Sequence, residues 1–180
     1  MSLITYNGLV ELVEQGVIQG VEHGQINAAS IDITLGDTFL VEAVDWDADG
    51  RDLVSLRRRD KPKFIEHTGK ILLRPGAFCL AQTREVFNLP NNIAAEYKLK
   101  SSMARIGLEH LNAGWCDPGW NGSVLTLELV NLLLDHDIEL EAGTAIGQIV
   151  FFRGEPVPDD RSYAARGRYN GDSKVMPIKP

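Results

Sequence analysis

The feature that most constrains the fold of this chain is a series of short segments in which apolar and polar residues alternate. The first segment begins at Ser30 and places an isoleucine or a leucine at every second position up to Leu35, before a turn signal at Gly36-Asp37. Such alternation is typical of a β-strand with one buried face. Further strands are predicted over residues 39–43, 70–73, 77–83, 93–100, 123–131, 137–140 and 145–153. The sequence therefore predicts a mainly β protein.

Turn-forming residue pairs separate these strands. They are Pro75-Gly76, Pro90-Asn91, Pro118-Gly119, Asn121-Gly122 and Ala142-Gly143. Short strands broken by such turns favour an antiparallel sandwich or jelly roll. One short helix is predicted ahead of the strands, because Leu9, Leu12 and Val13 recur at helical spacing. Thr5 would be its N-cap and Gly16 its end.

Size and charge limit the classes of partner. The chain has 180 residues, 44% of them hydrophobic, which suits one compact domain. Its 18 basic and 25 acidic residues give a formal net charge of −7, which disfavours binding to long nucleic acid. A small phosphorylated ligand stays compatible with this balance, because a few local cations are enough to hold it.

The sequence also predicts the compartment. Its longest apolar runs, at residues 129–134 and 146–152, fall short of the ~18 residues that a membrane span needs. The N-terminus has no basic segment followed by an apolar core, and Glu11 falls where that core would lie. We therefore expect a cytoplasmic protein that does not cross a membrane.

Several kinds of site are disfavoured. Cys79 and Cys116 are the only cysteines, and the four histidines are scattered, so neither a disulfide framework nor a zinc site is expected. The His-x-Glu and Pro-Cys-x-x-Cys pair of zinc-dependent nucleobase deaminases does not occur, and neither does a Walker A loop or a Gly-x-Ser-x-Gly motif.

Two opposite charge runs occupy residues 45–63. They are Asp45, Asp47, Asp49 and Asp52, followed by Arg57, Arg58, Arg59, Lys61 and Lys63. The spaced carboxylates resemble part of an EF-hand loop, but the glutamate at the twelfth position and the flanking helices are missing. A solvated hairpin or loop is the preferred interpretation.

The segment from Gly154 to Pro180 has a different composition from the rest of the chain. It holds four prolines and few aliphatic residues, and its cations are interleaved with Tyr163 and Tyr169. Such a segment cannot form a core by itself. It is either a frayed terminus or a lid that closes over an anionic ligand.

Two segments carry residues suited to chemistry. Ser101 and Ser102 follow a predicted strand and precede Arg105, an arrangement that fits either a phosphate site or ordinary helix capping. In the strand 123–131, Glu128 points away from the leucines on either side of it. Because an unpaired carboxylate in an apolar strand is costly, Glu128 is the best candidate for a general acid and base.

These segments share an order with a known family. Residues 30–36, 100–108, 113–120, 126–128 and 168–172 together resemble the dCTP deaminase family, a branch of the trimeric dUTPase superfamily. The resemblance implies a distorted jelly-roll, dUTPase-like antiparallel β domain over residues 1–153. A C-terminal tail over residues 154–180 would act as its lid.

The resemblance also implies roles for individual residues. Glu128 would activate a water for attack on C4 of cytosine without a metal, and Asp117 would bind the deoxyribose. Ser101, Ser102 and Arg105 would hold phosphates or orient the water. The full set of implied substrate-binding residues is Lys100, Ser101, Ser102, Met103, Ala104, Arg105, Ala113, Asp117, Thr126, Leu127, Gln148, Tyr163, Arg168 and Lys174.

The same resemblance implies an assembly and a metal ion. The substrates would be dCTP and dUTP, with Mg²⁺ bound through the triphosphate and no metal ligand from the protein. The sites would lie between the subunits of a homotrimer. The chain departs from the family pattern at Asp172, where a glutamine is common. We expect Asp172 to point away from the ligand, with Lys174 in its place.

Residues 112–117 bear on the product. They resemble the Thr-Ala-Gly-aromatic-Ile-Asp pattern of family members that also cleave dUTP to dUMP, with departures at Asn112 and Cys116. Gly114 is expected to leave room for a water beside the α-phosphate. Two alternatives stay open, namely a dUTP pyrophosphatase without deaminase activity and a non-catalytic, nucleotide-binding regulatory trimer.

Overall fold

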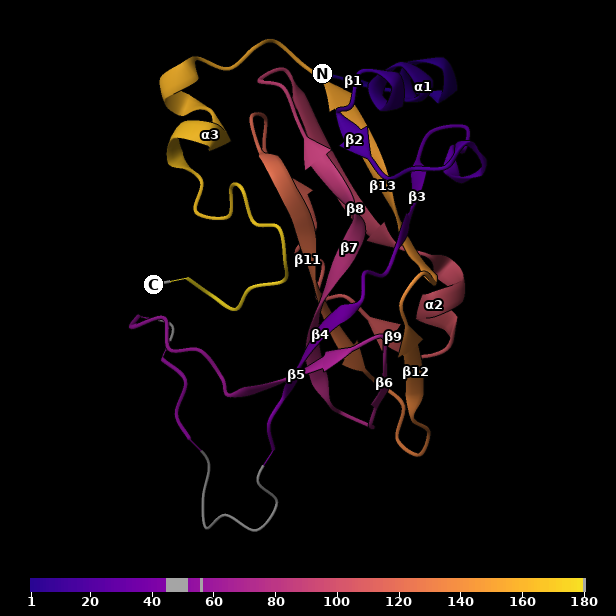
Figure 1. The fold of residues 1–180 in the computed structure, drawn as a ribbon, viewed down its shortest axis with the longest axis vertical. Coiled ribbons are helices and arrows are strands. Elements are labelled where there is room, and N and C mark those ends of the chain that lie inside the picture. Colours follow the sequence, from indigo (N-terminus) through magenta and orange to yellow (C-terminus); the bar gives the residue numbers. More distant parts are fainter. Residues whose placement is uncertain (45–51, 56, 180) are drawn as a thin grey trace.

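The structure is a computed structural model, and it describes residues 1–44, 52–55 and 57–179. Within these residues the chain forms two antiparallel sheets and a separate two-stranded ribbon, with short helices at the periphery (Figure 1). The mainly antiparallel β fold with a short N-terminal helix, predicted from the alternation, is confirmed.

The first sheet is built around the long strand β13. In the described chain its members are β1 (Ser2–Leu3), β3 (Ile31–Thr34), β8 (Ile93–Leu99), β10 (Trp115–Cys116) and β13 (Ala145–Arg153). β13 pairs with β8 along its length, from Gly147 opposite Leu99 to Arg153 opposite Ile93. β10 extends the sheet on the other side of β8.

The second sheet contains the two longest strands. In the described chain its members are β2 (Ile18–Gln19), β4 (Thr38–Glu42), β5 (Phe64–Thr68), β7 (Phe78–Asn88), β9 (Leu108–Glu109) and β11 (Asn121–Asn131). β11 pairs with β7 with Glu128 opposite Leu80 and Val130 opposite Phe78. The ribbon consists of β6 (Lys70–Leu73) and β12 (Ile138–Glu141).

In the residues that the structure describes, helices are few and short. They are α1 (Tyr6–Glu14), the 3-10 turn η1 (His23–Gln25), α2 (Ser101–Arg105), the 3-10 turn η2 (Asp159–Arg161) and α3 (Tyr163–Arg166). α1 lies inside the predicted helical segment and buries Leu9 and Leu12. Gly16, which follows it, has a φ of +72°, a backbone conformation that glycine adopts without steric cost.

The main core fills the space between the two sheets. Ile31 and Ile33 of β3 belong to the same buried cluster as Leu127 and Leu129 of β11 and Phe151 of β13. This is the arrangement that period-two alternation produces, because every second side chain of a strand reaches the same face. The opposite face of β11 carries Thr126 and Glu128, and it is therefore free to form a site.

β7 extends five residues beyond the predicted end at position 83. The predicted strand ends at position 83 because Arg84 and Glu85 interrupt the apolar alternation. Glu85 is fully buried, and its carboxylate accepts hydrogen bonds from Gln25 Nε2 at 3.0 Å and Thr34 Oγ1 at 2.8 Å. A buried carboxylate satisfied in this way can occupy a core position that its residue type would not predict.

The charged region before β5 is a loop where it is described. Arg58 pairs with Asp60 at 2.6 Å, and Lys63 pairs with Asp52 at 3.0 Å. The predictions on Asp45, Asp47 and Asp49 lie outside the described residues. β5 itself was not predicted, because Glu66 and His67 interrupt the apolar pattern and four of its five residues are exposed.

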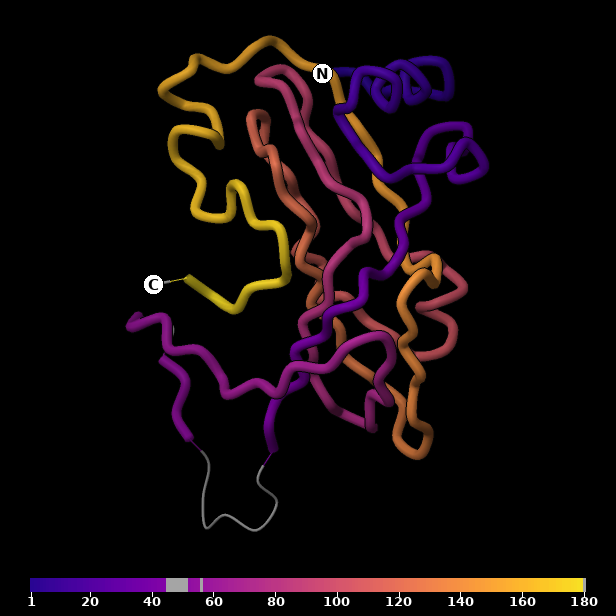
Figure 2. The backbone as a smooth tube through the Cα atoms, viewed as in Figure 1, coloured from indigo at the N-terminus to yellow at the C-terminus, as the bar shows by residue number. Residues whose placement is uncertain are grey.

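The C-terminal segment returns along the second sheet. After β13 it passes through η2 and α3 and then runs beside the start of β11 (Figures 1 and 2). Trp120 Nε1 donates to the Tyr169 carbonyl at 2.7 Å, and Val124 N donates to the Asp172 carbonyl at 2.9 Å. Val175 is 4% exposed and packs on Leu40 and Leu80. The segment is thus an ordered strap across the sheet.

Candidate active site

A cavity of about 460 Å³ lies between the polar face of β11, the loop before it and the C-terminal strap. Phe64 and Phe78 form part of its wall, with their ring centroids 6.2 Å apart. Trp115, Trp120, Tyr163 and Tyr169 add further aromatic surface. A cavity of this size and character can enclose a flat, polar-edged ring system. We call it the acidic cavity, because Asp117, Glu128 and Asp172 line it.

Glu128 lies in the wall of this cavity with Thr126 beside it. Burial raises the pKa of Glu128 from 4.5 to about 7, and a hydrogen bond with its own backbone offsets only a part of the shift. A carboxyl group that titrates near neutral pH can both accept and return a proton. The orientation predicted from the sequence, with the leucines inward and Glu128 outward, is confirmed.

The loop before β11 brings a second carboxylate into the cavity. Asp117 lines the cavity, and its Oδ1 accepts a hydrogen bond of 2.9 Å from Trp115 Nε1. The Trp115 ring stacks on Phe152 of β13, with centroids 6.3 Å apart. Both contacts hold the carboxylate in one orientation, so that Asp117 can receive a ligand hydroxyl without first losing side-chain freedom.

Gly114 does not leave room for a water in this cavity, so that prediction is wrong. A Cβ built on Gly114 would lie 2.5 Å from the carbonyl oxygen of Tyr97. The glycine is needed because the loop runs against the backbone of β8, where Tyr97 N donates to the Gly114 carbonyl at 2.8 Å. It positions its neighbours Ala113 and Trp115, both of which line the cavity.

Asn112 has a left-handed backbone, with φ at +54°. Asparagine tolerates this conformation, whereas a β-branched threonine does not adopt it readily. The departure from the family's threonine therefore has a local explanation in this chain. The side chain of Asn112 is exposed and is not part of the cavity wall.

The strap closes the open side of the cavity with Tyr163, Tyr169, Asp172, Met176 and Ile178. Asp172 lines the cavity and is paired with Lys179 at 2.5 Å, so the prediction that it points away is wrong. It is held there because its backbone is hydrogen-bonded to Ser123 and Val124. Arg168 and Lys174 are exposed and do not line the cavity in this chain.

The charge of the cavity wall is one-sided. Asp117, Glu128 and Asp172 are its ionisable carboxyl groups, and among the described residues no lysine or arginine lines it. Burial also raises the pKa of the Tyr163 hydroxyl, so this side chain stays neutral. The cavity therefore suits the uncharged part of a ligand and supplies no cation for an anionic part.

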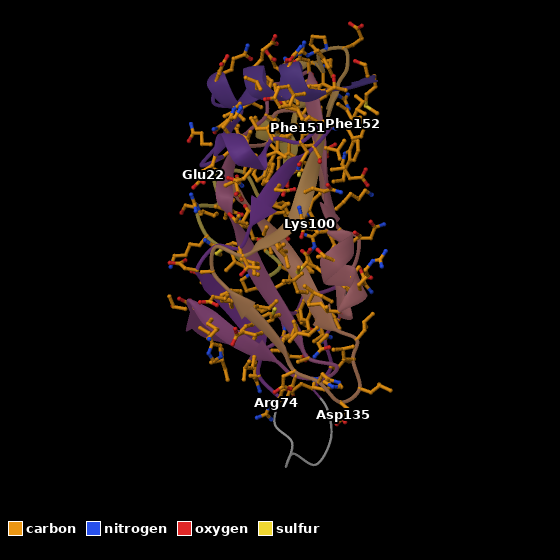
Figure 3. The ribbon with its side chains drawn as sticks, turned by 90° about the vertical axis from the view of Figure 1, so that its right-hand side faces the viewer. Glu22, Arg74, Lys100, Asp135, Phe151 and Phe152 are labelled. Atoms are coloured by element: carbon orange, nitrogen blue, oxygen red, sulfur yellow. The ribbon has the colours of Figure 1, made fainter. Side chains whose placement is uncertain are left out.

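A second polar region lies around α2, on the opposite side of the molecule from the strap (Figure 1). We call it the α2 cluster, and it consists of Lys100, Ser101, Ser102, Arg105 and Gln148. Figure 3 shows Lys100 on this face, next to α2. Lys100 Nζ donates to Asp32 Oδ2 at 2.6 Å, and Asn27 Nδ2 donates to Asp32 Oδ1 at 2.9 Å.

Most of the rest of the α2 cluster is open to solvent, and only Gln148 is partly buried. Gln148 accepts a hydrogen bond of 3.1 Å from Ser30 Oγ. Ser101, Ser102 and Arg105 are exposed, and Arg105 makes no ion pair within the part of the chain that the structure describes. Neither serine side chain caps the helix. These groups are thus available to an anion that arrives from outside the chain.

The structure divides the predicted site residues between these two regions. Ala113, Asp117, Thr126, Glu128 and Tyr163 line the acidic cavity. Lys100, Ser101, Ser102, Ala104, Arg105 and Gln148 lie at or beside α2. The side chains of Met103 and Leu127 pack against the core. One chain does not bring the two groups together.

Sequence reasoning missed part of each region. Phe78 and Leu80 were assigned to a strand, but their place opposite Val130 and Glu128 follows only from the pairing register. Asp32 lies in the predicted strand 30–35, and the alternation there gives no sign that it binds Lys100. Lys179 lies in the predicted C-terminal tail, and nothing in that tail's sequence indicates its pairing with Asp172.

The described residues hold neither a cluster suited to a metal ion nor a membrane-spanning helix. No three histidine, cysteine, aspartate or glutamate side chains gather there in a way that could hold a metal ion. No helix in that part of the chain is long and apolar enough to span a bilayer. Cys79 and Cys116 are free and buried, and burial raises the pKa of each thiol to about 12, which makes both inert as nucleophiles.

The fold is that of a deoxynucleotide deaminase of known structure. The crystal structure of 2'-deoxycytidine 5'-triphosphate deaminase from Agrobacterium tumefaciens superimposes with a TM-score of 0.66 and 18% identity. The match covers 84% of this chain and 48% of that protein, so the chain spans about half of its length. At this identity the likeness establishes the fold alone.

Sequence comparison establishes the family. A family model described as dCTP deaminase-like matches residues 5–154. The "dCTP deaminase, dUMP-forming" of Methanosphaerula palustris is 34% identical over 88% of this chain and 83% of its own. The protein of the same description from Aquifex aeolicus is 31% identical over 98% of this chain and 94% of its own. The chain belongs to the dCTP deaminase-like family, as its ordered motifs predicted.

Proposed function

We propose that this protein deaminates dCTP and hydrolyses the resulting dUTP, so that dUMP, ammonia and pyrophosphate are its products. The observation that carries the proposal is Glu128, a carboxyl group with a raised pKa in an aromatic cavity of nucleobase size. The curated relatives at 31–40% identity are described as dUMP-forming dCTP deaminases.

In the first step, Glu128 accepts a proton from a water molecule whose oxygen attacks C4 of cytosine. The protonated Glu128 then gives its proton to the amino group, which leaves as ammonia. A pKa of about 7 suits both transfers, because neither protonation state is strongly favoured near neutral pH. Thr126 and the backbone of Leu127 would fix the base, and Asp117 would bind the deoxyribose.

In the second step, a water attacks the α-phosphate of dUTP and pyrophosphate leaves. Asp117 or Glu128 would accept the proton of this water, since both carboxylates line the same cavity. Mg²⁺ would enter with the nucleotide as part of the substrate and offset the charge of the leaving group. The attacking water does not need space at Gly114, because Ala113 and Trp115 on either side of Gly114 line the cavity.

The active unit would be a homotrimer in which each site draws on two chains. The acidic cavity has no described cation in its wall, and the cations and hydroxyls suited to a triphosphate lie in the α2 cluster on the other side. A triphosphate nucleotide needs a cavity for its base and cations for its phosphates. The α2 cluster of a neighbouring chain would therefore complete the site. The cytoplasmic location predicted from the sequence remains a prediction.

A direct assay tests the proposal. The chain is incubated with dCTP and Mg²⁺, and dCTP, dUTP, dUMP, pyrophosphate and ammonia are separated. Equal amounts of dUMP, ammonia and pyrophosphate are expected. Stoichiometric dUTP without pyrophosphate would limit the activity to deamination. If the protein cleaves added dUTP but releases no ammonia from dCTP, it is a dUTP pyrophosphatase. If it binds both nucleotides and converts neither, it is a regulatory trimer.

Mixing two impaired variants tests the shared site, at a dCTP concentration well below the dissociation constant of the Arg105→Ala chain. Chains with Glu128→Gln keep an intact α2 cluster, and chains with Arg105→Ala keep an intact cavity. If the sites lie between subunits, random co-refolding places both intact halves together in about one site in four, and about that share of activity returns. If each chain forms its own site, the mixture is no more active than the average of the two variants assayed separately.

A further inference from the structure

The C-terminal strap carries a charged group into the wall of the acidic cavity. Asp172 has 17% of its side chain exposed and lines the cavity. Its backbone is fixed on β11, because its carbonyl accepts from Val124 N at 2.9 Å and its N–H donates to Ser123 Oγ at 3.3 Å. The backbone of Asp172 therefore stays at the cavity wall unless the strap itself moves.

Lys179 is held against this carboxylate by several contacts. Its Nζ donates to Asp172 Oδ1 at 2.5 Å and to the Arg168 carbonyl at 2.9 Å, and it lies 5.3 Å from the centroid of the Tyr169 ring. Only 28% of the Lys179 side chain is exposed. These contacts close residues 168–179 into a loop, with Met176 and Ile178 of that loop against the cavity.

We propose that Lys179 is a positioning residue that cancels the charge of Asp172 and so allows an anionic nucleotide to bind beneath the closed strap. The inference rests on the proposed function, in which the ligand carries a triphosphate. Without Lys179 the wall would present the carboxylates of Asp117 and Asp172 to that ligand without compensation, since no described lysine or arginine lines it. With Lys179 in place, the strap contributes no net charge from this pair.

Two substitutions at this ion pair should change the affinity for dCTP in opposite directions. Lys179→Met leaves Asp172 uncompensated and should weaken binding of dCTP, whereas Asp172→Asn leaves Lys179 uncompensated and should strengthen it. The double variant again has no net charge at the pair and should return to the starting affinity. One partly screened unit charge changes the affinity for dCTP by about fivefold in each direction.

The experiment measures dissociation constants by calorimetry in chains that also carry Glu128→Gln, so that dCTP is not consumed. Each chain is titrated with dCTP and, separately, with uncharged deoxycytidine. The Asp172→Asn chain should bind dCTP most tightly and the Lys179→Met chain most weakly. The parent and the double variant should have equal affinities between these two. The dissociation constants of deoxycytidine for all four chains should agree within about twofold, because deoxycytidine has no phosphate charge that could interact with Asp172 or Lys179.

Salt and control variants complete the test. The deficit of Lys179→Met should shrink between about 0.05 M and about 0.5 M salt, because mobile ions screen the repulsion. Lys179→Arg should retain the parent affinity. Lys70→Met is the matched control, because Lys70 forms an ion pair with Glu139 at 3.0 Å on the β6–β12 ribbon, outside the cavity wall.

Two results would overturn the inference. Equal weakening in Lys179→Met and in the double variant would show that Lys179 contacts the nucleotide or supports the strap instead of cancelling Asp172. An equal loss of affinity for deoxycytidine would show that the strap has lost its structure. Failure of the proposed function is seen separately, as no release of ammonia from dCTP by the chain with its native residues.

Discussion

The acidic cavity and the α2 cluster differ in charge, in burial and in the way their residues are held. The cavity gathers three carboxyl groups among aromatic rings and raises the pKa of one of them to about 7. The α2 cluster exposes its two serines and Arg105 to solvent, and its main fixed contact is the 2.6 Å ion pair between Lys100 and Asp32. The cavity can perform proton transfer, and the cluster can hold an anion. Within a single chain, neither region can do both.

The largest effect is expected from Glu128→Gln, which removes the proton acceptor of the cavity and keeps its shape. The rate constant kcat for ammonia release from dCTP should fall about 10²- to 10⁴-fold, the usual contribution of a general acid and base. Binding of dCTP should be retained. Glu66→Gln on the exposed strand β5 is the control. A loss of less than about tenfold would remove Glu128 from the proposed role.

Arg105→Ala tests the other region. Loss of a charge-assisted contact with phosphate should raise the dissociation constant of dCTP about 10- to 100-fold. The effect on dCMP should be smaller, because dCMP lacks the outer phosphates. The ratio of the two dissociation constants is therefore the measurement. An unchanged ratio would mean that Arg105 does not contact the triphosphate.

The raised pKa of Glu128 predicts that the stability of the fold depends on pH. Between pH 4.5 and about 7 the folded chain binds more protons than the unfolded chain at this group, so its contribution to the free energy of unfolding falls as the pH rises. Relative to Glu128→Gln, the native chain should lose about 1 to 3 kcal/mol across this window. Denaturant titrations of both chains at pH 4.5 and 8 measure the difference.

The smallest effect concerns the strap. Val175 is 4% exposed and contacts the minor apolar cluster with Leu40 and Leu80, so Val175→Ala should lower the free energy of unfolding by about 1 to 2 kcal/mol. The exposed Met176 beside it serves as the control position. Thermal unfolding of Val175→Ala and Met176→Ala compares the two. Equal stability of both variants would mean that the strap does not dock as described.

Removal of the strap after Arg161 extends that test. Since most of the main core lies between the sheets, the truncated chain should stay folded. It should lose activity, because Tyr163, Tyr169 and Asp172 leave the cavity wall with it. Circular dichroism and the ammonia assay measure the two properties. An unfolded product would make the strap part of the folding core.

The sequence by itself determined the local features of this protein. Period-two alternation predicted the principal strands, and it placed Glu128 on the face of β11 opposite Leu125, Leu127 and Leu129. The order of the motifs identified the family. These properties depend on residues close together in the chain, whose side-chain directions follow from backbone geometry.

The tertiary structure alone decided which of these residues share a site. Lys100 and Asp32 are 68 positions apart, and the Gln82 side chain that accepts a hydrogen bond from Val175 N is 93 positions away. Asp172 faces the cavity because its backbone is fixed on β11, and Gly114 is required by the backbone of β8. Such contacts depend on strand register and on the docking of the strap, and the alternation of residue types specifies neither.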